Sequence, residues 1–362
     1  MGDIALARPR VGTLALAVTQ SNVPAAAPVH EEPTVLGTLC YGVDTERAAE
    51  GGAPRLHVPM PRLDGRDTPC EIWQGGAACK EGEQGIVRYR YNKDALFGVI
   101  SLRESSYSMQ DGKTPLRRAA EAAYHALFAV QRELRFPHLY RCWNYLADIN
   151  GESHGLERYR QFNLGRQDAH TAAHRDVPAD FPAACALGAA AGPLNIAFLA
   201  GRALPVRVEN PRQVSAYQYP DQYGPRTPLF SRATLLRLPD RLLLLVSGTA
   251  SVVGHATRHA GDVVAQAHET FNNLEAVIAE ANRLAGGHQP RYRLRDLVMR
   301  VFVRHPADLA SEQAVVAQRT DGTAHAVYLR ADVCRPDLLL EIEAHATVLL
   351  SPARGRGSAQ GD

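Results

Sequence analysis

The same order of predicted elements occurs twice in this chain, and this repetition limits the possible folds more than any other feature. Each copy consists of a strand, a helix, a strand, a helix and two closing strands, as judged from the spacing of apolar residues. The first copy begins near residue 97 and the second near residue 242. An internal duplication is the simplest explanation, and it predicts an α/β (α+β) protein with two domains of the same topology.

In the first copy, residues 95–102 form an apolar run typical of a strand. From Pro115 onward, apolar residues recur at helical spacing. Residues 139–149 favour a second strand, and residues 156–162 a second helix. The small apolar residues of 181–202 indicate two buried strands, with a helix as the alternative because the stretch is rich in Ala and Gly.

The second copy follows the same plan, and its long helix has one continuous apolar face. In the order strand, helix, strand, helix, strand and strand, its predicted elements are residues 242–253, 263–284, 296–303, 309–317, 326–329 and 338–345.

At 362 residues the chain is longer than one ordinary core supports, so we expect two domains. The sequence divides into an N-terminal domain (1–205), a linker (206–232), a C-terminal domain (233–350) and a disordered tail (351–362). The linker is irregular and holds three tyrosines, several prolines and several arginines. Aromatic residues at this density argue against disorder, so we expect the linker to contribute to a site.

The composition is that of a soluble globular protein, with 45% hydrophobic and 22% charged residues. A net charge of +2 gives no reason to expect nucleic acid or an anionic membrane as a partner. No apolar run approaches the roughly 20 residues that a membrane-spanning helix needs. We therefore expect no membrane partner.

Six cysteines are scattered without CxxC spacing or a disulfide framework, so we expect free thiols and a cytoplasmic location. Near the N-terminus, Arg8 and Arg10 precede an apolar run at 11–18, with three alanines at 25–27. This arrangement faintly imitates a signal peptide. The run is short and contains Thr13, which favours a first strand over export.

The last predicted strand alternates apolar and acidic residues in the order Leu340, Glu341, Ile342 and Glu343. Because successive side chains of a strand point to opposite faces, the two acids share one face. One interpretation is a sheet with a solvated face. The other is a carboxyl group in a cleft, where partial burial raises its pKa so that it acts as a general acid.

Three stretches of the second copy resemble the Rid (YjgF-like) fold in their order: SGTASVV, GDVVAQAHETFNNLEAVIAEA and LRADVCRPDLLLEIEAHA. In that family a strand ending in Ser-Gly precedes a helix with an Asn-Leu pair, and the chain ends on a strand of Glu-Ile-Glu type. The resemblance covers residues 242–350 and implies two fused Rid-like domains with mixed sheets, each covered by helices on one face. It also implies that Glu341 faces a ligand pocket between neighbouring copies.

Further motifs occur along the whole chain: WNYLADIN, LERYRQF, AYQYPDQYGPRTPLFSRA and VSGTASVVGH. With them the sequence is similar to the chorismatases, Rid-like enzymes that hydrolyse chorismate to pyruvate and a cyclic acid. The resemblance implies chorismate as the substrate, no cofactor, and Glu341 as the general acid that protonates the methylene carbon of the enol ether.

Chorismate carries two carboxylates, and arginine is their preferred partner because its planar guanidinium pairs with a carboxylate through two hydrogen bonds. Tyrosines add hydroxyl donors and flat walls for a six-membered ring. The alternative is that these residues are surface charges and packing side chains. The candidates for substrate binding are Arg160, Arg166, Tyr217, Tyr219, Tyr223, Arg226 and Arg232.

In the resembled family, a small residue after Ser in the SGTA strand and a Cys before the last strand imply 3-hydroxybenzoate as the product. It forms when a ring hydroxyl displaces the pyruvyl group through an arene oxide. These positions are Gly248 and Cys334 here. A bulkier Ala at the first position implies a dihydroxylated diene acid. Cys334 is a candidate for assisting proton transfer on the ring, or else a buried small apolar residue.

The sequence leaves two other functions open. One is a different chorismate activity, giving 4-hydroxybenzoate or 3,4-dihydroxycyclohexa-1,5-diene carboxylate, and the other is a non-catalytic Rid-like sensor of small molecules. The pairs His255 and His259, and His170 and His174, are spaced i, i+4, but without a third ligand we predict no metal site. We expect a monomer, since a duplicated chain would bury within itself the interface that single-copy relatives form between subunits.

Overall fold

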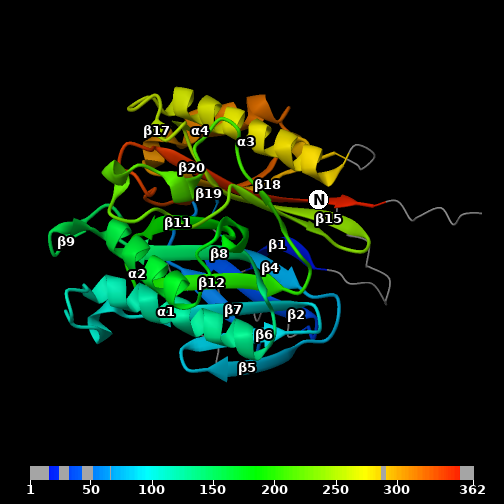
Figure 1. Ribbon diagram of the computed structural model, residues 1–362. Helices are drawn as coiled ribbons and strands as arrows, with labels where there is room; N and C mark the ends of the chain where they lie inside the picture. The colour runs from blue at the N-terminus through cyan, green and yellow to red at the C-terminus, as the bar shows by residue number, and fades with distance from the viewer. Residues whose placement is uncertain (1–15, 24–31, 43–51, 66, 287–290, 351–362) are drawn as a thin grey trace, which may run out of the picture.

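The computed structural model describes residues 16–23, 32–42, 52–65, 67–286 and 291–350. Within these ranges, two six-stranded sheets and one four-stranded sheet pack around a shared interior, and helices cover the outer faces of the two large sheets (Figure 1).

The first large sheet belongs to the first copy and has the strand order β11-β8-β12-β7-β6-β5. Strands β8 and β11 are parallel, and the other neighbours are antiparallel. The Thr114 side chain accepts the N–H of Arg117 and so caps the first helix, α1. The elements are β5 (Lys80–Gln84), β6 (Val87–Tyr91), β7 (Ala95–Leu102), α1 (Pro115–Glu133), β8 (His138–Ala147), α2 (Arg158–Ala172), β11 (Ala183–Ala189) and β12 (Leu194–Gly201).

The second large sheet belongs to the second copy and has the strand order β13-β14-β15-β20-β18-β19. Strands β18 and β19 are parallel, and the other neighbours are antiparallel. Asp262 caps α3, and Gly286 ends it with a φ of 95°. The elements are β13 (Val206–Val208), β14 (Ala233–Arg237), β15 (Arg241–Thr249), α3 (Val263–Ala285), β18 (Val298–Val303), α4 (Leu309–Arg319), β19 (His325–Arg330) and β20 (Leu340–Leu349).

The two large sheets have the same topology, strand for strand, with the parallel pair at the same edge. The predicted duplication and the mixed α+β fold class are therefore confirmed. Residues 181–202 form strands β11 and β12, so the helical alternative for this stretch is wrong. The helix predicted from residue 156 begins at Arg158, after the short strands β9 (Glu152–Ser153) and β10 (Leu156–Glu157).

The four-stranded sheet comes from the N-terminal part of the chain and has the order β1-β4-β2-β3. Its inner face meets the inner faces of both large sheets in one apolar core that includes Trp73, Trp143 and Phe302. Separate apolar cores lie between each large sheet and its helices. The strands are β1 (Ala17–Val23), β2 (Val35–Tyr41), β3 (Arg55–Val58) and β4 (Thr68–Gln74).

Cys40 and Cys70 form a disulfide between β2 and β4, so the expectation that all six cysteines are free is wrong. The two residues lie 30 positions apart in sequence but face each other in the antiparallel register of the two strands. Sequence spacing does not show a pair that strand pairing creates. The remaining cysteines are free: Cys79, Cys142, Cys185 and Cys334.

Several N- and C-terminal predictions lie outside the described residues. These are the signal-like features at Arg8, Arg10 and 25–27, most of the strand at 11–18, and the disordered tail at 351–362. The first described strand is β1, which begins at Ala17. Within the described ranges, none of the helices combines the length and the apolar character needed to cross a membrane.

Candidate active site

A cavity of about 680 Å³ opens between the two copies, where β11 of the first large sheet lies against β15 of the second. Its wall is built from α2, the linker, β15, the loop before β20, and β20 itself. It brings together eight of the ten residues that the sequence singles out: Arg160, Arg166, Tyr219, Tyr223, Arg232, Gly248, Cys334 and Glu341.

The other two predicted residues, Tyr217 and Arg226, do not line this cavity. The Tyr217 ring packs against Phe181, with ring centroids 5.3 Å apart. Arg226 is exposed at the surface. Both belong to the linker, where neighbouring side chains point in different directions because the backbone is irregular.

Glu341 lies in the wall of the cavity on β20 and is 4% exposed. Its Oε1 atom has no hydrogen-bond partner among the described residues. Burial, helped by the negative charge of Glu343, raises the pKa of Glu341 to about 8, although Arg141 and Arg232 oppose the shift. Glu341 is therefore a carboxylic acid at neutral pH and can donate a proton.

Glu343 lies on the same face of β20 but is fully buried and ion-paired. Arg141 of β8 and the Arg300 side chain of β18 both donate hydrogen bonds to its carboxylate. Burial alone would raise the pKa of Glu343, but the two guanidiniums outweigh burial and hold its pKa below the usual range. The interpretation of this face as solvated is wrong for both acids.

Gly248 leaves the space that the Glu341 side chain occupies. A Cβ atom at position 248 would lie 1.8 Å from Oε1 and 2.5 Å from Cδ of Glu341. The residue lies where the pairing of β15 with β20 shifts register, between Val246 and Thr249. Any side chain at this position forces the Glu341 carboxyl group to move.

Arg166 and Arg232 are buried arginines that form no ion pair with a carboxylate among the described residues, although the carboxyl group of Glu209 lies near Arg232. Arg166 donates to Asn163 at 2.8 Å, and Arg232 donates to the Tyr219 hydroxyl at 2.8 Å. The Nε atom of each arginine lacks an acceptor in the described chain. Buried guanidiniums with unused donors are suited to binding anionic groups of a ligand.

Close packing of α2 against α1 sets the position of Arg166. A Cβ atom at Gly165 would lie 2.0 Å from the carbonyl oxygen of Arg117, so only glycine allows this approach. Arg166 then points inward from α2, with its guanidinium 5.2 Å from the centre of the Phe162 ring.

Arg160 and two tyrosines form the outer part of the cavity wall. Unlike the buried arginines, Arg160 is paired, because its Nε atom donates to Glu157 at 3.1 Å. The rings of Tyr219 and Tyr223 lie 5.4 Å apart between their centres and are tilted by 45°, and the Tyr223 hydroxyl lies 3.1 Å from Nδ1 of His255. The sequence predicts both tyrosines as walls for a six-membered ring, and both line the cavity.

The cavity wall includes residues that the sequence reasoning missed, above all Arg335 and Tyr159. The Arg335 guanidinium lies 4.0 Å from the Tyr223 ring centre and forms no ion pair in the described chain. The sequence motifs could have indicated both residues as site candidates, because Arg335 follows Cys334 directly and Tyr159 lies inside the LERYRQF motif.

Cys334 lies in the cavity wall next to these groups. Burial, with a contribution from Glu341, raises the pKa of its thiol to about 12. Cys334 is therefore a neutral thiol at physiological pH and acts as a weak hydrogen-bond donor, not as a nucleophilic thiolate.

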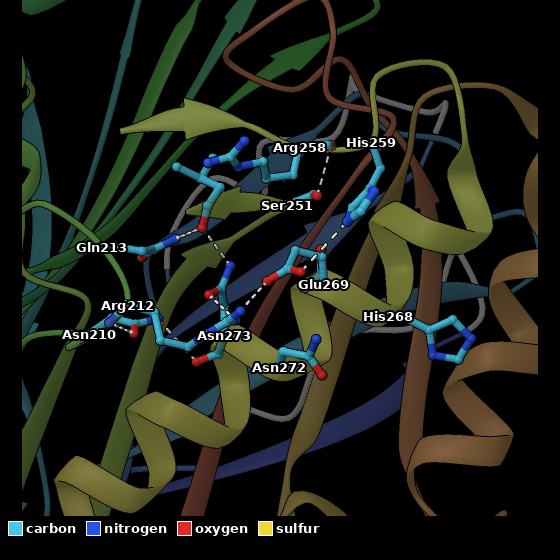
Figure 2. A network of polar contacts seen from close by, with 12 residues as sticks. Asn210, Arg212, Gln213, Ser251, Arg258, His259, His268, Glu269, Asn272 and Asn273 are labelled. Atoms are coloured by element: carbon cyan, nitrogen blue, oxygen red, sulfur yellow. Dashed lines mark hydrogen bonds and ion pairs between the residues drawn. The ribbon is translucent and has the colours of Figure 1, made fainter. Parts of the chain in front are cut away.

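A polar network joins the linker and the loop after β15, both of which contribute to the cavity wall (Figure 2). Asn273 of α3 donates to the carbonyl oxygens of Ala250 and Val252, both at 2.9 Å. Arg212 donates to Asn273 at 2.8 Å and pairs with Glu269 at 2.6 Å. The linker and the short strands β16 (Val252–Val253) and β17 (Ala256–Thr257) are thereby fixed to α3.

In the histidine pairs spaced i, i+4, His170 and His259 contact other protein groups. His170 is buried among aromatic rings, where its Nδ1 atom lies 2.7 Å from the Arg175 carbonyl oxygen and burial lowers its pKa to about 3. His259 lies 3.6 Å from Glu269. No group of three or more potential metal ligands occurs within the described ranges.

Taken together, the cavity offers a neutral acid, two buried guanidiniums with unused donors, and aromatic walls. Such an arrangement defines an acid–base site for a small anionic molecule.

Comparisons with known proteins identify relatives of this chain. Residues 71–200 match the family model described as chorismatase FkbO/Hyg5-like, N-terminal. A chorismatase of Streptomyces hygroscopicus is 36% identical over 316 residues, which is 86% of this chain and 89% of that protein. A 3-hydroxybenzoate synthase of the same species is 34% identical, covering 85% of this chain and 90% of that protein.

A crystal structure of chorismatase aligns with a TM-score of 0.82 and 34% identity, over 93% of this chain and 100% of that chain. The sequence and the structure thus match over nearly their whole length. The chain belongs to the chorismatase family, as the sequence motifs predicted.

Proposed function

We propose that the cavity binds chorismate and that Glu341 protonates the terminal methylene carbon of its enol ether, giving 3-hydroxybenzoate and pyruvate. The observation that carries the proposal is the neutral Glu341 carboxyl group in a cavity with two buried arginines that form no ion pair among the described residues. The names of the relatives, chorismatase and 3-hydroxybenzoate synthase, support the same substrate and product.

The two inner arginines are the proposed clamps for the two carboxylates of chorismate. Arg166 comes from the first copy and Arg232 from the end of the linker. A dianion bound between them would therefore be held by two separate segments of the chain. Arg335 and Arg160 supply further positive charge in the outer wall. Tyr219 and Tyr223 pack against the ring of the substrate in this proposal.

Protonation of the methylene carbon converts the enol ether into an oxocarbenium ion and leaves Glu341 as a carboxylate. The neighbouring ring hydroxyl then attacks the ring carbon that carries the ether, the carbon–oxygen bond to the pyruvyl group breaks, and pyruvate leaves as the ketone. The hydroxyl proton returns to the Glu341 carboxylate. The resulting arene oxide opens to 3-hydroxybenzoate, so no water is consumed.

Gly248 and Cys334 support the choice of product. Because a methyl group at 248 would overlap the Glu341 carboxyl group, glycine lets that acid keep its place. The neutral Cys334 thiol is available as a weak donor during proton transfer on the ring. We expect Gly248→Ala to shift the acid and to move the product toward the diene diol.

The experiment is incubation of the purified protein with chorismate, with coupled detection of pyruvate and chromatographic separation of the cyclic products. We expect equal amounts of pyruvate and 3-hydroxybenzoate. The diene diol or 4-hydroxybenzoate as the main product would overturn the product assignment. Chorismate binding without pyruvate release would indicate a sensor. An unchanged product in Gly248→Ala would show that Gly248 does not determine which product forms.

A further inference from the structure

The loop of residues 332–338 carries much of the cavity wall to the start of β20. Cys334 and Arg335 lie at its centre, and Glu341 follows only a few residues later. The position of this loop therefore sets where a thiol and a guanidinium lie relative to the proposed acid. Its backbone is irregular, so something other than sheet hydrogen bonding must hold it.

Arg304, directly after β18, supplies that support. It does not line the cavity, and its side chain is 10% exposed. Each of the five N–H groups of a guanidinium can donate one hydrogen bond, and all five find an acceptor here. The acceptors are the carbonyl oxygens of Leu338 (2.8 Å), Val333 (3.0 Å) and Arg335 (2.9 Å), and the side chains of Asp332 (2.8 Å) and Asn150 (3.1 Å).

Two of these bonds lie on either side of Cys334. The carbonyl groups of Val333 and Arg335 flank the cysteine, and both are bound by the Nη2 atom of Arg304. Other contacts hold the loop at its ends: Gly188 pairs with Asp332, and Gln266 donates to the carbonyl oxygen of Asp337 at 2.8 Å. Between these ends, Arg304 fixes the backbone of the two cavity residues.

We propose that Arg304 is a positioning residue, which sets the places of Cys334 and Arg335 relative to Glu341 and thereby the partition between products. This role rests on the proposed function of the cavity. Lysine at this position keeps the charge but has only three donors on a single nitrogen, so it cannot bind the spread of acceptors that the planar guanidinium reaches.

The test compares Arg304→Lys and Arg304→Met with Arg319→Met. Arg319 is a matched control because it also donates to a carbonyl oxygen and to a side chain, and pairs with Glu275, yet it does not line the cavity. The readouts are total pyruvate release, the fraction of 3-hydroxybenzoate among the cyclic products, and the alkylation rate of Cys334, located by mass spectrometry. Thermal denaturation of each variant reports stability.

We expect both Arg304 variants to lower pyruvate release by about tenfold or more, since a small misplacement of a group in the site has effects of that order. The fraction of 3-hydroxybenzoate falls, and Cys334 is alkylated several times faster. Arg319→Met leaves the product fraction and the alkylation rate unchanged, even where it lowers the Tm. If Arg304→Met does not fold, the comparison of Arg304→Lys with the wild type tests the positioning role by itself.

Arg304 variants that lose stability but keep the wild-type product fraction and alkylation rate would show a merely structural role and overturn the proposal. The alkylation rate does not depend on which product the wild type forms. A wild type that releases no 3-hydroxybenzoate would therefore contradict the proposed function, while the alkylation rate still decides the role of Arg304.

Discussion

Glu341 and Glu343 carry the same functional group two residues apart on β20, yet their surroundings give them opposite protonation states at neutral pH. Glu341 faces a cavity and has an oxygen without a hydrogen-bond partner in the described chain, whereas Glu343 is paired with Arg141 and Arg300. The charged neighbour also helps to keep Glu341 protonated. The alternation of the strand predicts that the two acids share a face, but only their partners show which one holds a proton.

The pH dependence of activity follows from this difference. A general acid works in its protonated form, and the pKa of Glu341 is raised to about 8, so the acid is available at neutral pH and is lost as the pH rises through about 8. We expect kcat/KM for pyruvate release to be level below this value and to fall by about tenfold per pH unit above it. Steady-state kinetics over this range, with the Tm measured at each pH, provide the test. A rate that rises with pH above 8 would contradict the assignment.

At the scale of single elements, α4 contains an acid that the proposed mechanism does not use. Glu312 is fully buried, and neither of its carboxyl oxygens has a hydrogen-bond partner among the described residues. Burial, followed by the nearby Asp308, raises its pKa to about 9. The folded protein therefore keeps Glu312 protonated at a pH where the unfolded chain releases this proton.

This shift makes stability depend on pH with a definite sign. The stability that the raised pKa contributes is fully present below the unfolded pKa and is lost as the pH rises toward about 9. Glu312→Gln keeps the size but cannot titrate. We expect the variant to match the wild type near pH 4 and to exceed it by about 3–5 kcal/mol near pH 8 in urea unfolding. An equal difference at both pH values would mean that the titration of Glu312 is not the cause.

Much of the element order could be predicted from the sequence, because helices α1 and α3 and strands β7 and β20 carry regular apolar patterns. Contacts between distant segments could not be predicted from the sequence. The disulfide between Cys40 and Cys70 depends on strand pairing, and the support by Arg304 depends on a loop that follows a different strand. In the irregular linker, where no period relates side chains, the sequence could not separate Tyr219, in the cavity, from Tyr217, outside it.

At the scale of the whole molecule, a buried ion-pair network joins all three sheets. Arg141 of the first large sheet donates to Glu343 and to the carbonyl oxygen of Val246 in the second. Arg300 of the second large sheet pairs with Glu343 and with Glu71 of the four-stranded sheet. Because these groups are buried at the point where the sheets meet, each copy satisfies charges of the other.

The network predicts a large stability difference between two arginine variants. Arg141→Met leaves a buried carboxylate with one partner fewer, and we expect a loss of about 3–5 kcal/mol in urea unfolding. Arg283→Met breaks an exposed pair with Glu280 on α3 and should cost far less, because solvent screens that pair. Equal losses in the two variants would show that the buried network does not hold the copies together.

The central claim is that Glu341 gives the proton that cleaves the enol ether. Glu341→Gln keeps the size of the side chain and can still form hydrogen bonds, but it has no proton to give at neutral pH. The decisive measurement is the rate of pyruvate release from chorismate by this variant, with binding of chorismate and the Tm measured on the same preparation. We predict a loss of at least about a hundredfold in rate with chorismate still bound. A folded variant that releases pyruvate at the wild-type rate would contradict the account.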